Sequence, residues 1–202
     1  MKYRGFLPLF AFVILVLAVG LACGGATAPT QAPAPPQPAQ TESASSNSGG
    51  MQTFTDQNDY YHIQLPSDWK YEQTVDKEDD YYYIDTFTSP DEHALIENIV
   101  YDDGTAFTGS DKSRFALYLL NTFYSDTGKE GDIRVSDDSI QKDGSERLIW
   151  RSTGGKYSGT SFLETRGSAR TTFLFFTVEY DNDFKDTYLD LLNDVIASYT
   201  VP

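Results

Sequence analysis

Apolar side chains alternate with polar ones along three segments in the first half of residues 51–202. In the stretch YYHIQLPSDW, Tyr61, Ile63 and Leu65 alternate with polar neighbours, and a proline ends the run. A period of two predicts a strand with one buried face. The stretch YYYIDTFTSPDEHALIENIVY lies on both sides of a turn at 89–92, and it predicts two further strands joined by that turn.

The period then changes to that of a helix. In SDKSRFALYLLNTFYSD, Phe115, Leu119 and Phe123 recur at four-residue steps, which predicts an amphipathic helix of about four turns. Ser110 or Asp111 is the expected N-cap. Four strands follow, separated by short segments rich in Gly and Ser, so we expect an antiparallel meander joined by hairpins. The four strands cover Ile133–Ile140, Glu146–Ser152, Ser161–Thr165 and Thr171–Tyr180.

The last of these strands, TTFLFFTVEY, is apolar on both faces, which is typical of a central strand covered on each side. A second amphipathic helix closes the chain, and its apolar stripe consists of Phe184, Tyr188, Leu191, Leu192, Val195 and Ile196. Asp181–Asp183 supply caps and favourable charge at its start. This order of elements predicts an α+β fold, a mostly antiparallel β-sheet with helices packed on it.

The first 22 residues have the layout of an export signal. Two basic residues precede an apolar run of 17 residues from Phe6 to Ala22, whereas a membrane-spanning helix needs about 20. The stretch VGLAC resembles the lipobox of bacterial lipoproteins, in which the cysteine receives a diacylglyceryl group and becomes the new N-terminus. Gly20 stands three residues before Cys23, where leucine is usual. The resemblance implies a signal peptide over residues 1–22 and a lipidated Cys23.

Residues 23–50 predict a disordered tether behind that lipid. After Cys23 they include five prolines, one charged residue and no aromatic residue, so they cannot bury enough apolar surface to offset the entropy of ordering. An uncleaved N-terminal anchor remains the alternative to lipidation. Because basic residues stay on the cytoplasmic side, both interpretations place residues 51–202 at the extracytoplasmic face of the cell membrane.

The composition excludes several classes of function. Without residues 1–22 the chain has 13 basic and 30 acidic residues, a formal charge of −17. Nucleic acids and anionic bilayer surfaces both need clustered basic residues, so we expect neither as a partner. The acidity is consistent with a cationic partner or with solubility alone. Cys23 is the only cysteine, which excludes disulfides, thiolate zinc sites and cysteine nucleophiles from residues 51–202.

Three stretches, YHIQLPSDW, FTSPDEHA and LLNDVIASY, resemble the PsbP-like superfamily. Pro66, Trp69, Ser89 and Pro90 are the sharpest points of the resemblance. That family includes photosystem II extrinsic proteins, a nuclear transport factor that binds a small GTPase, and many bacterial lipoproteins of unassigned role. The resemblance implies an α-β-α sandwich over residues 51–202. It supplies no general catalytic set and no cofactor.

Candidate chemistry is sparse. Of the two histidines, His62 lies in a predicted strand and His93 follows a turn, and the chain has no G-x-S-x-G nucleophile elbow. We therefore do not expect an enzyme. Acidic residues gather at 76–80, 102–103 and 181–186. These runs leave a weak calcium site open, although DNDFKD departs from the calcium-loop pattern, and solvated loops explain the same residues.

The stretch VDKEDDYYYIDTF combines tyrosines with carboxylates. Tyr81, Tyr83 and Asp85 recur at every second position and could line a cleft for a small ligand or a cation. Packing of the tyrosines on the sheet is the other interpretation. A concave pocket lined by these three residues would favour ligand binding, and a flat patch would favour a protein partner. We expect a non-catalytic interaction or accessory module for an envelope protein, with the small-ligand or cation-binding lipoprotein as the alternative.

Overall fold

The computed structural model describes residues 50–124 and 132–202. The predicted signal peptide at 1–22, the lipidated Cys23 and all of the tether except its last residue lie outside these ranges. Within the described part of the chain, no helix is long and apolar enough to cross a membrane.

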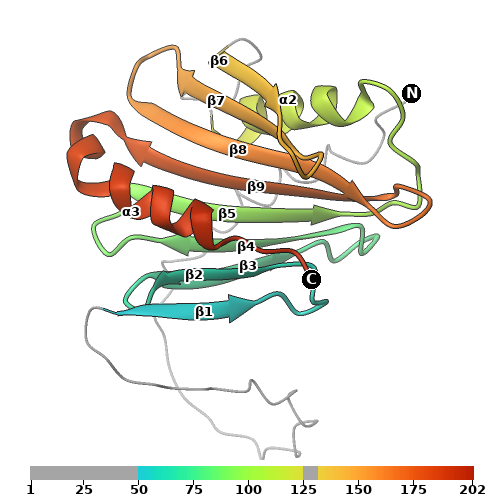
Figure 1. Cartoon of the computed structure of the whole chain (residues 1–202), viewed down its shortest axis with the longest axis horizontal. Coiled ribbons are helices and arrows are strands. Elements are labelled where there is room, and N and C mark those ends of the chain that lie inside the picture. The colour runs from blue at the N-terminus through green and yellow to red at the C-terminus, as the bar shows by residue number, and fades with distance from the viewer. Residues whose placement is uncertain (1–49, 125–131) are drawn as a thin grey trace, which may run out of the picture. The chain divides into compact units, whose positions relative to one another are not determined.

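Seven strands form one antiparallel sheet in the order β3-β4-β5-β9-β8-β7-β6 (Figure 1). Their bounds are β3 Lys70–Val75, β4 Tyr82–Thr88, β5 Ala94–Tyr101, β6 Ile133–Ile140, β7 Glu146–Ser152, β8 Tyr157–Arg166 and β9 Thr172–Asp181. The last four strands pair as successive neighbours, which confirms the predicted meander. β9 is the middle strand, and its residues 172–178 are all buried, as its apolar faces predict.

The helices cover opposite faces of this sheet (Figure 1). α2 spans Asp111–Phe123 and α3 spans Lys185–Ser198. Along β9, Phe173 and Phe175 pack in one core cluster with α2, whereas Phe176 packs in another cluster with α3. Because successive side chains of a strand point to opposite faces, the sheet lies between the two helices. The predicted α+β fold, with an α-β-α arrangement, is confirmed.

A second sheet of two strands packs on the same face as α3. β1 (Met51–Thr55) pairs antiparallel with β2 (His62–Pro66). Ile63 and Leu65 of β2 are fully buried and share a core cluster with Val195 of α3. The predicted alternation of buried and polar positions in this segment is therefore confirmed, and the small sheet helps to close one side of the core.

The alternation rule predicts neither β1 nor β3, so five strands precede α2 rather than three. β3 exposes all six of its side chains. β1 buries only Phe54, and only in part. Neither strand has a face that is consistently buried, and both form because their backbones pair with a neighbouring strand. Such pairing leaves no periodic signal in the sequence.

The helix starts differ in how they are capped. Ser110, and not Asp111, takes the N-cap position of α2, but its side chain makes no capping hydrogen bond. A short 3-10 turn, η1 (Asn182–Phe184), precedes α3, and the Asp181 carboxylate accepts a hydrogen bond from the Asp183 amide at 3.0 Å. The predicted aspartate cap is therefore present, one turn before the α-helix itself.

Candidate functional site

The predicted ligand-binding residues lie at and just before β4. Asp85 has no exposed surface and Tyr83 is buried, whereas Tyr81 is exposed to solvent. Three side chains donate hydrogen bonds to the Asp85 carboxylate: the Tyr61 hydroxyl at 2.8 Å, the Tyr71 hydroxyl at 2.7 Å and the Gln73 amide at 2.9 Å. Both carboxylate oxygens of Asp85 are thus engaged inside the domain.

A second tyrosine–aspartate pair links the same two sheets, but here the tyrosine belongs to the large sheet and the aspartate to the loop after β1. The Tyr83 hydroxyl of β4 donates to the carboxylate of Asp56 at 2.7 Å, and Asp56 follows β1. The Tyr61 hydroxyl, just before β2, donates to Asp85 of β4. The two tyrosine–aspartate pairs therefore join the small sheet to the large one, a role that the sequence pattern does not reveal.

Burial sets the protonation of this network. Desolvation raises the pKa of Asp85, while the hydrogen bonds from Tyr71, Tyr61 and Gln73 act against that rise. Desolvation and the hydrogen bond to Asp56 also raise the pKa of Tyr83. The tyrosine hydroxyls consequently keep their protons and act as donors. Binding of a ligand by Tyr81, Tyr83 and Asp85 stays a prediction.

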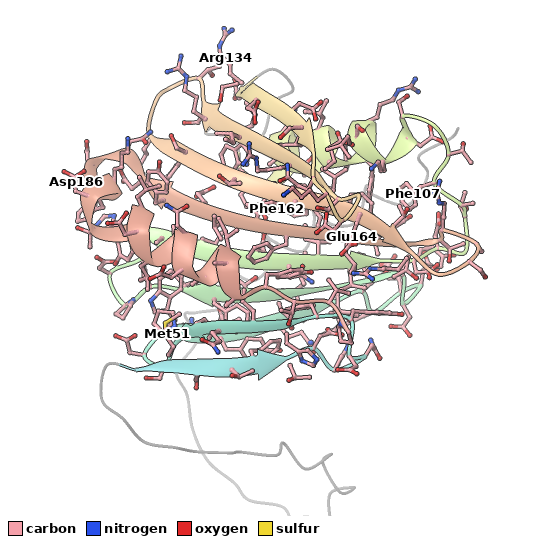
Figure 2. All side chains as sticks on the ribbon, viewed as in Figure 1. Met51, Phe107, Arg134, Phe162, Glu164 and Asp186 are labelled. Carbon is pink, nitrogen blue, oxygen red and sulfur yellow. The ribbon has the colours of Figure 1, made fainter. Side chains whose placement is uncertain are left out.

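An open groove of about 390 Å³ lies elsewhere, on the side of the large sheet that carries α3. It is formed by the start of β1, the β2–β3 turn, the β4–β5 turn and α3. Its lining residues are Gly50, Met51, Pro66, Asp68, Trp69, Pro90, Asp91, Tyr188 and Leu191. Met51, labelled in Figure 2, lies at the start of β1. Two turns and the start of β1, which are distant from α3 in the sequence, thus meet at that helix.

Trp69 and Tyr188 supply the aromatic part of the groove. Both are largely buried, and their rings meet edge to face with centroids 6.1 Å apart. Such an arrangement is favourable for a pair of aromatic rings. Each ring is held by the core cluster around α3, so this part of the groove is rigid.

Asp91 is fixed in position by three donors to a single oxygen. Its Oδ1 accepts hydrogen bonds from the Ser89 hydroxyl at 2.8 Å, the His93 amide at 3.2 Å and the Tyr188 hydroxyl. The Tyr188 bond is the main cause that holds the pKa of Asp91 below its usual range. The carboxylate is therefore ionised at neutral pH and oriented by its turn.

The histidines have local contacts. His62 bonds Thr55 at 3.0 Å and lies 3.3 Å from a carboxylate oxygen of Asp59. His93 stacks on Phe184, with ring centroids 3.5 Å apart. In residues 50–124 and 132–202, no three His, Cys, Asp or Glu side chains are grouped so that they could hold a metal ion.

The first residue of each acidic run binds backbone amides of its own turn. Asp76 accepts from the amides of Glu78 and Tyr81, and Asp102 accepts from the amide of Gly104. Asp181 caps η1 in the same way. These contacts give the first residue of each run a turn-forming role.

Comparison with known proteins identifies the fold of the domain through solved structures. No family model and no curated protein matches the sequence. The chain is similar to the solution structure of cyanobacterial PsbP (CyanoP) from Synechocystis sp. PCC 6803, with 17% identity, 79% of this chain and 96% of that chain covered, and a TM-score of 0.53. The Ran-binding protein Mog1p of Saccharomyces cerevisiae gives 10% identity, 76% and 96% coverage, and a TM-score of 0.44. The likeness to CyanoP shows that the domain has a PsbP-like fold.

Proposed function

We propose that this protein is a lipid-anchored lipoprotein at the extracytoplasmic face of the cell membrane, and that its PsbP-like domain is a non-catalytic interaction module. Its partner in this proposal is another protein of the envelope, which docks in the groove between the turns and α3. The lipobox-like sequence at Cys23 and the proline-rich segment behind it support the anchor and the tether.

The groove is the observation on which the proposed interaction rests. Its floor contains a tryptophan, a tyrosine and a leucine, and carboxylates lie at its exposed edge. An aromatic centre with a polar rim is the usual anatomy of a protein interface, and Trp and Tyr are enriched among the residues that contribute most binding energy. Gly50, where the tether meets the domain, also lines the groove.

The small-ligand alternative at Tyr81, Tyr83 and Asp85 stays a separate prediction. Ligand binding by Asp85 would require the internal bonds from Tyr61 and Tyr71 to open. The groove needs no such rearrangement, and for that reason we favour it as the docking site.

Photo-crosslinking in intact cells tests the proposal. A photoreactive amino acid replaces Met51 in the groove or, as the matched control, Leu117 on the outer side of α2. The two side chains are 43% and 40% exposed, and α2 covers the opposite face of the sheet. We expect a single envelope protein to be crosslinked from position 51 and not from position 117. Crosslinking of that protein from position 117 alone, or no crosslink from position 51, would contradict docking in the groove.

A Cys23→Ser variant tests the anchor separately. Without the thiol no lipid can be attached and cleavage before residue 23 does not occur, so we expect the wild type to begin at a lipidated Cys23 and the variant to keep residues 1–22, a difference that mass spectrometry measures. Residues 1–22 retained in both proteins, with no lipid on either, would favour the uncleaved N-terminal anchor.

A further inference from the structure

The groove has a charge pattern that restricts what can occupy it. Two of its lining residues, Asp68 and Asp91, are acidic, and no lysine or arginine is among the described residues that line it. Lys70, close in sequence, pairs with Glu72 at 3.0 Å. No lysine or arginine among the described lining residues therefore offsets the negative charge of the groove.

Asp91 is arranged to receive a donor from outside the domain. Its Oδ1 holds the three internal hydrogen bonds, so those bonds fix the direction of the whole carboxylate. Within residues 50–124 and 132–202, no hydrogen bond reaches its other oxygen, Oδ2. The side chain is exposed. A donor from a partner can therefore bind Oδ2 without disturbing the turn.

Asp68 supplies a second acceptor from the β2–β3 turn. Its side chain is exposed and has no hydrogen bond or ion pair to another described residue. Because Asp68 and Asp91 come from different turns, they supply two carboxylates to one groove. A partner that covered the groove with apolar side chains alone would remove water from both carboxylates without replacing it, which is costly.

The aromatic pair suits the remainder of a basic side chain. The aliphatic stem of lysine or arginine packs on apolar surface while its charged end stays at a polar edge. Trp69 and Tyr188 therefore complement the stem, and the carboxylates complement the charged end.

We infer that the groove binds a lysine or arginine side chain carried by an exposed basic segment of the partner protein. This inference rests on the proposed interaction function and adds the chemistry of the partner. Complementary charge of this kind contributes to the specificity and rate of association. A second copy of this chain, with a formal charge of −17 once residues 1–22 are removed, is a poor occupant because two such copies repel each other.

Fluorine NMR of the full-length lipidated protein in detergent provides the test. The chain has two tryptophans, Trp69 in the groove and Trp150 in the core beneath α2. Labelling with 5-fluorotryptophan therefore gives one signal that reports on the groove and one internal control. The probes are capped Ala-Lys-Ala and Ala-Arg-Ala peptides, the Ala-norleucine-Ala peptide that lacks only the charged group, and n-butylamine.

We expect the lysine and arginine peptides to shift the Trp69 signal saturably and to leave the Trp150 signal unchanged. Asp68→Asn should weaken this binding about 5-fold, the size expected for loss of one charge at an exposed site. Asp79→Asn removes one charge from a turn outside the groove, and it should change the affinity less than 2-fold. Asp68 has no internal partner, so its substitution should not affect folding, whereas Asp91→Asn also disturbs a turn.

Equal binding of the norleucine and lysine peptides would overturn the inference, and so would an Asp68→Asn variant with unchanged affinity. If n-butylamine bound as tightly as the lysine peptide, the amine and its stem would suffice for binding. That result would overturn the claim that the occupant is a segment of a protein. If crosslinking from position 51 recovers a partner but the basic peptides do not bind, the interaction function stands and the inferred chemistry is wrong. If no partner is crosslinked from position 51, the proposed function itself is wrong.

Discussion

Replacing Asp85 with alanine tests whether the tyrosine–aspartate pairs stabilise the junction of the two sheets. The change removes the acceptor for Tyr61, Tyr71 and Gln73. Tyr71 is 39% exposed and Gln73 is also at the surface, so water can replace their lost bonds. Tyr61 is 1% exposed and cannot reach water. The loss is therefore concentrated in one buried hydroxyl.

The size of the effect follows from that difference. An unsatisfied buried donor costs about 1–3 kcal/mol, and each bond that water can replace costs about 0.5 kcal/mol. Removing a buried carboxylate also relieves its desolvation, which acts in the other direction. We expect Asp85→Ala to lower the free energy of unfolding by about 2 kcal/mol at pH 7. For a domain of this size the melting temperature should fall by about 4–8 °C.

The pH dependence gives an independent check through Asp85→Asn. Because the folded domain raises the pKa of Asp85, the folded state takes up a proton at a higher pH than the unfolded chain does. Its contribution to stability is complete below the unfolded pKa of about 3.9 and is lost as the pH rises through the folded pKa. The wild-type protein should therefore gain stability relative to Asp85→Asn as the pH falls from 7 towards 4.

Urea unfolding of the full-length protein, followed by near-ultraviolet circular dichroism, measures both effects. Asp79→Ala, an exposed carboxylate outside the network, serves as the control and should change stability by less than about 0.5 kcal/mol. The reasoning would be refuted if Asp85→Ala were as stable as this control. It would also be refuted if the advantage of the wild type over Asp85→Asn increased with rising pH.

Three further changes have definite expected results. In Gly159→Ala, the new Cβ would lie 2.4 Å from Cζ2 of Trp150 and 2.7 Å from the Val178 carbonyl oxygen, so urea unfolding should show a loss of about 3 kcal/mol; unchanged stability would contradict this packing. The buried amide of Asn98 has no hydrogen-bond partner among the described residues, and Asn98→Val should gain about 1 kcal/mol in the same assay, whereas a loss would indicate that the amide is satisfied. Cys23→Ser should abolish incorporation of labelled palmitate in growing cells, and retained label would contradict the lipobox assignment.

Strands and helices that bury one or both faces could be predicted from the sequence. β7 begins and ends where the pattern predicts, and β9 is the central strand that its apolar residues indicate. β6, an edge strand with no fully buried side chain, is also predicted, because Ile133 and Val135 are half-buried and alternate with exposed neighbours. β1 and β3 could not be predicted, because their side chains are mostly exposed. Edge pairing depends on the backbone of a neighbouring strand, and that is a long-range property of the fold.

The candidate site also could be predicted from the sequence only in part. Alternation correctly puts Tyr83 and Asp85 on one face of a strand, but it does not reveal that the hairpin around Asp56 and Tyr61 covers that face. The groove requires two separate turns, the start of β1 and α3 to meet. Trp69 and Pro90 stand out in the sequence through the PsbP-like resemblance alone, and nothing local indicates that they share a groove with Tyr188.

The crosslinking yield from position 51 compared with position 117, in cells that contain the lipidated protein, tests the central claim most directly. Both positions carry the same photoreactive group at nearly equal exposure, so a difference between them reports on the groove. We predict one envelope protein crosslinked strongly from position 51, weakly or not at all from position 117, and less from position 51 when Asp68→Asn is added. Equal yields from both positions would contradict docking in the groove.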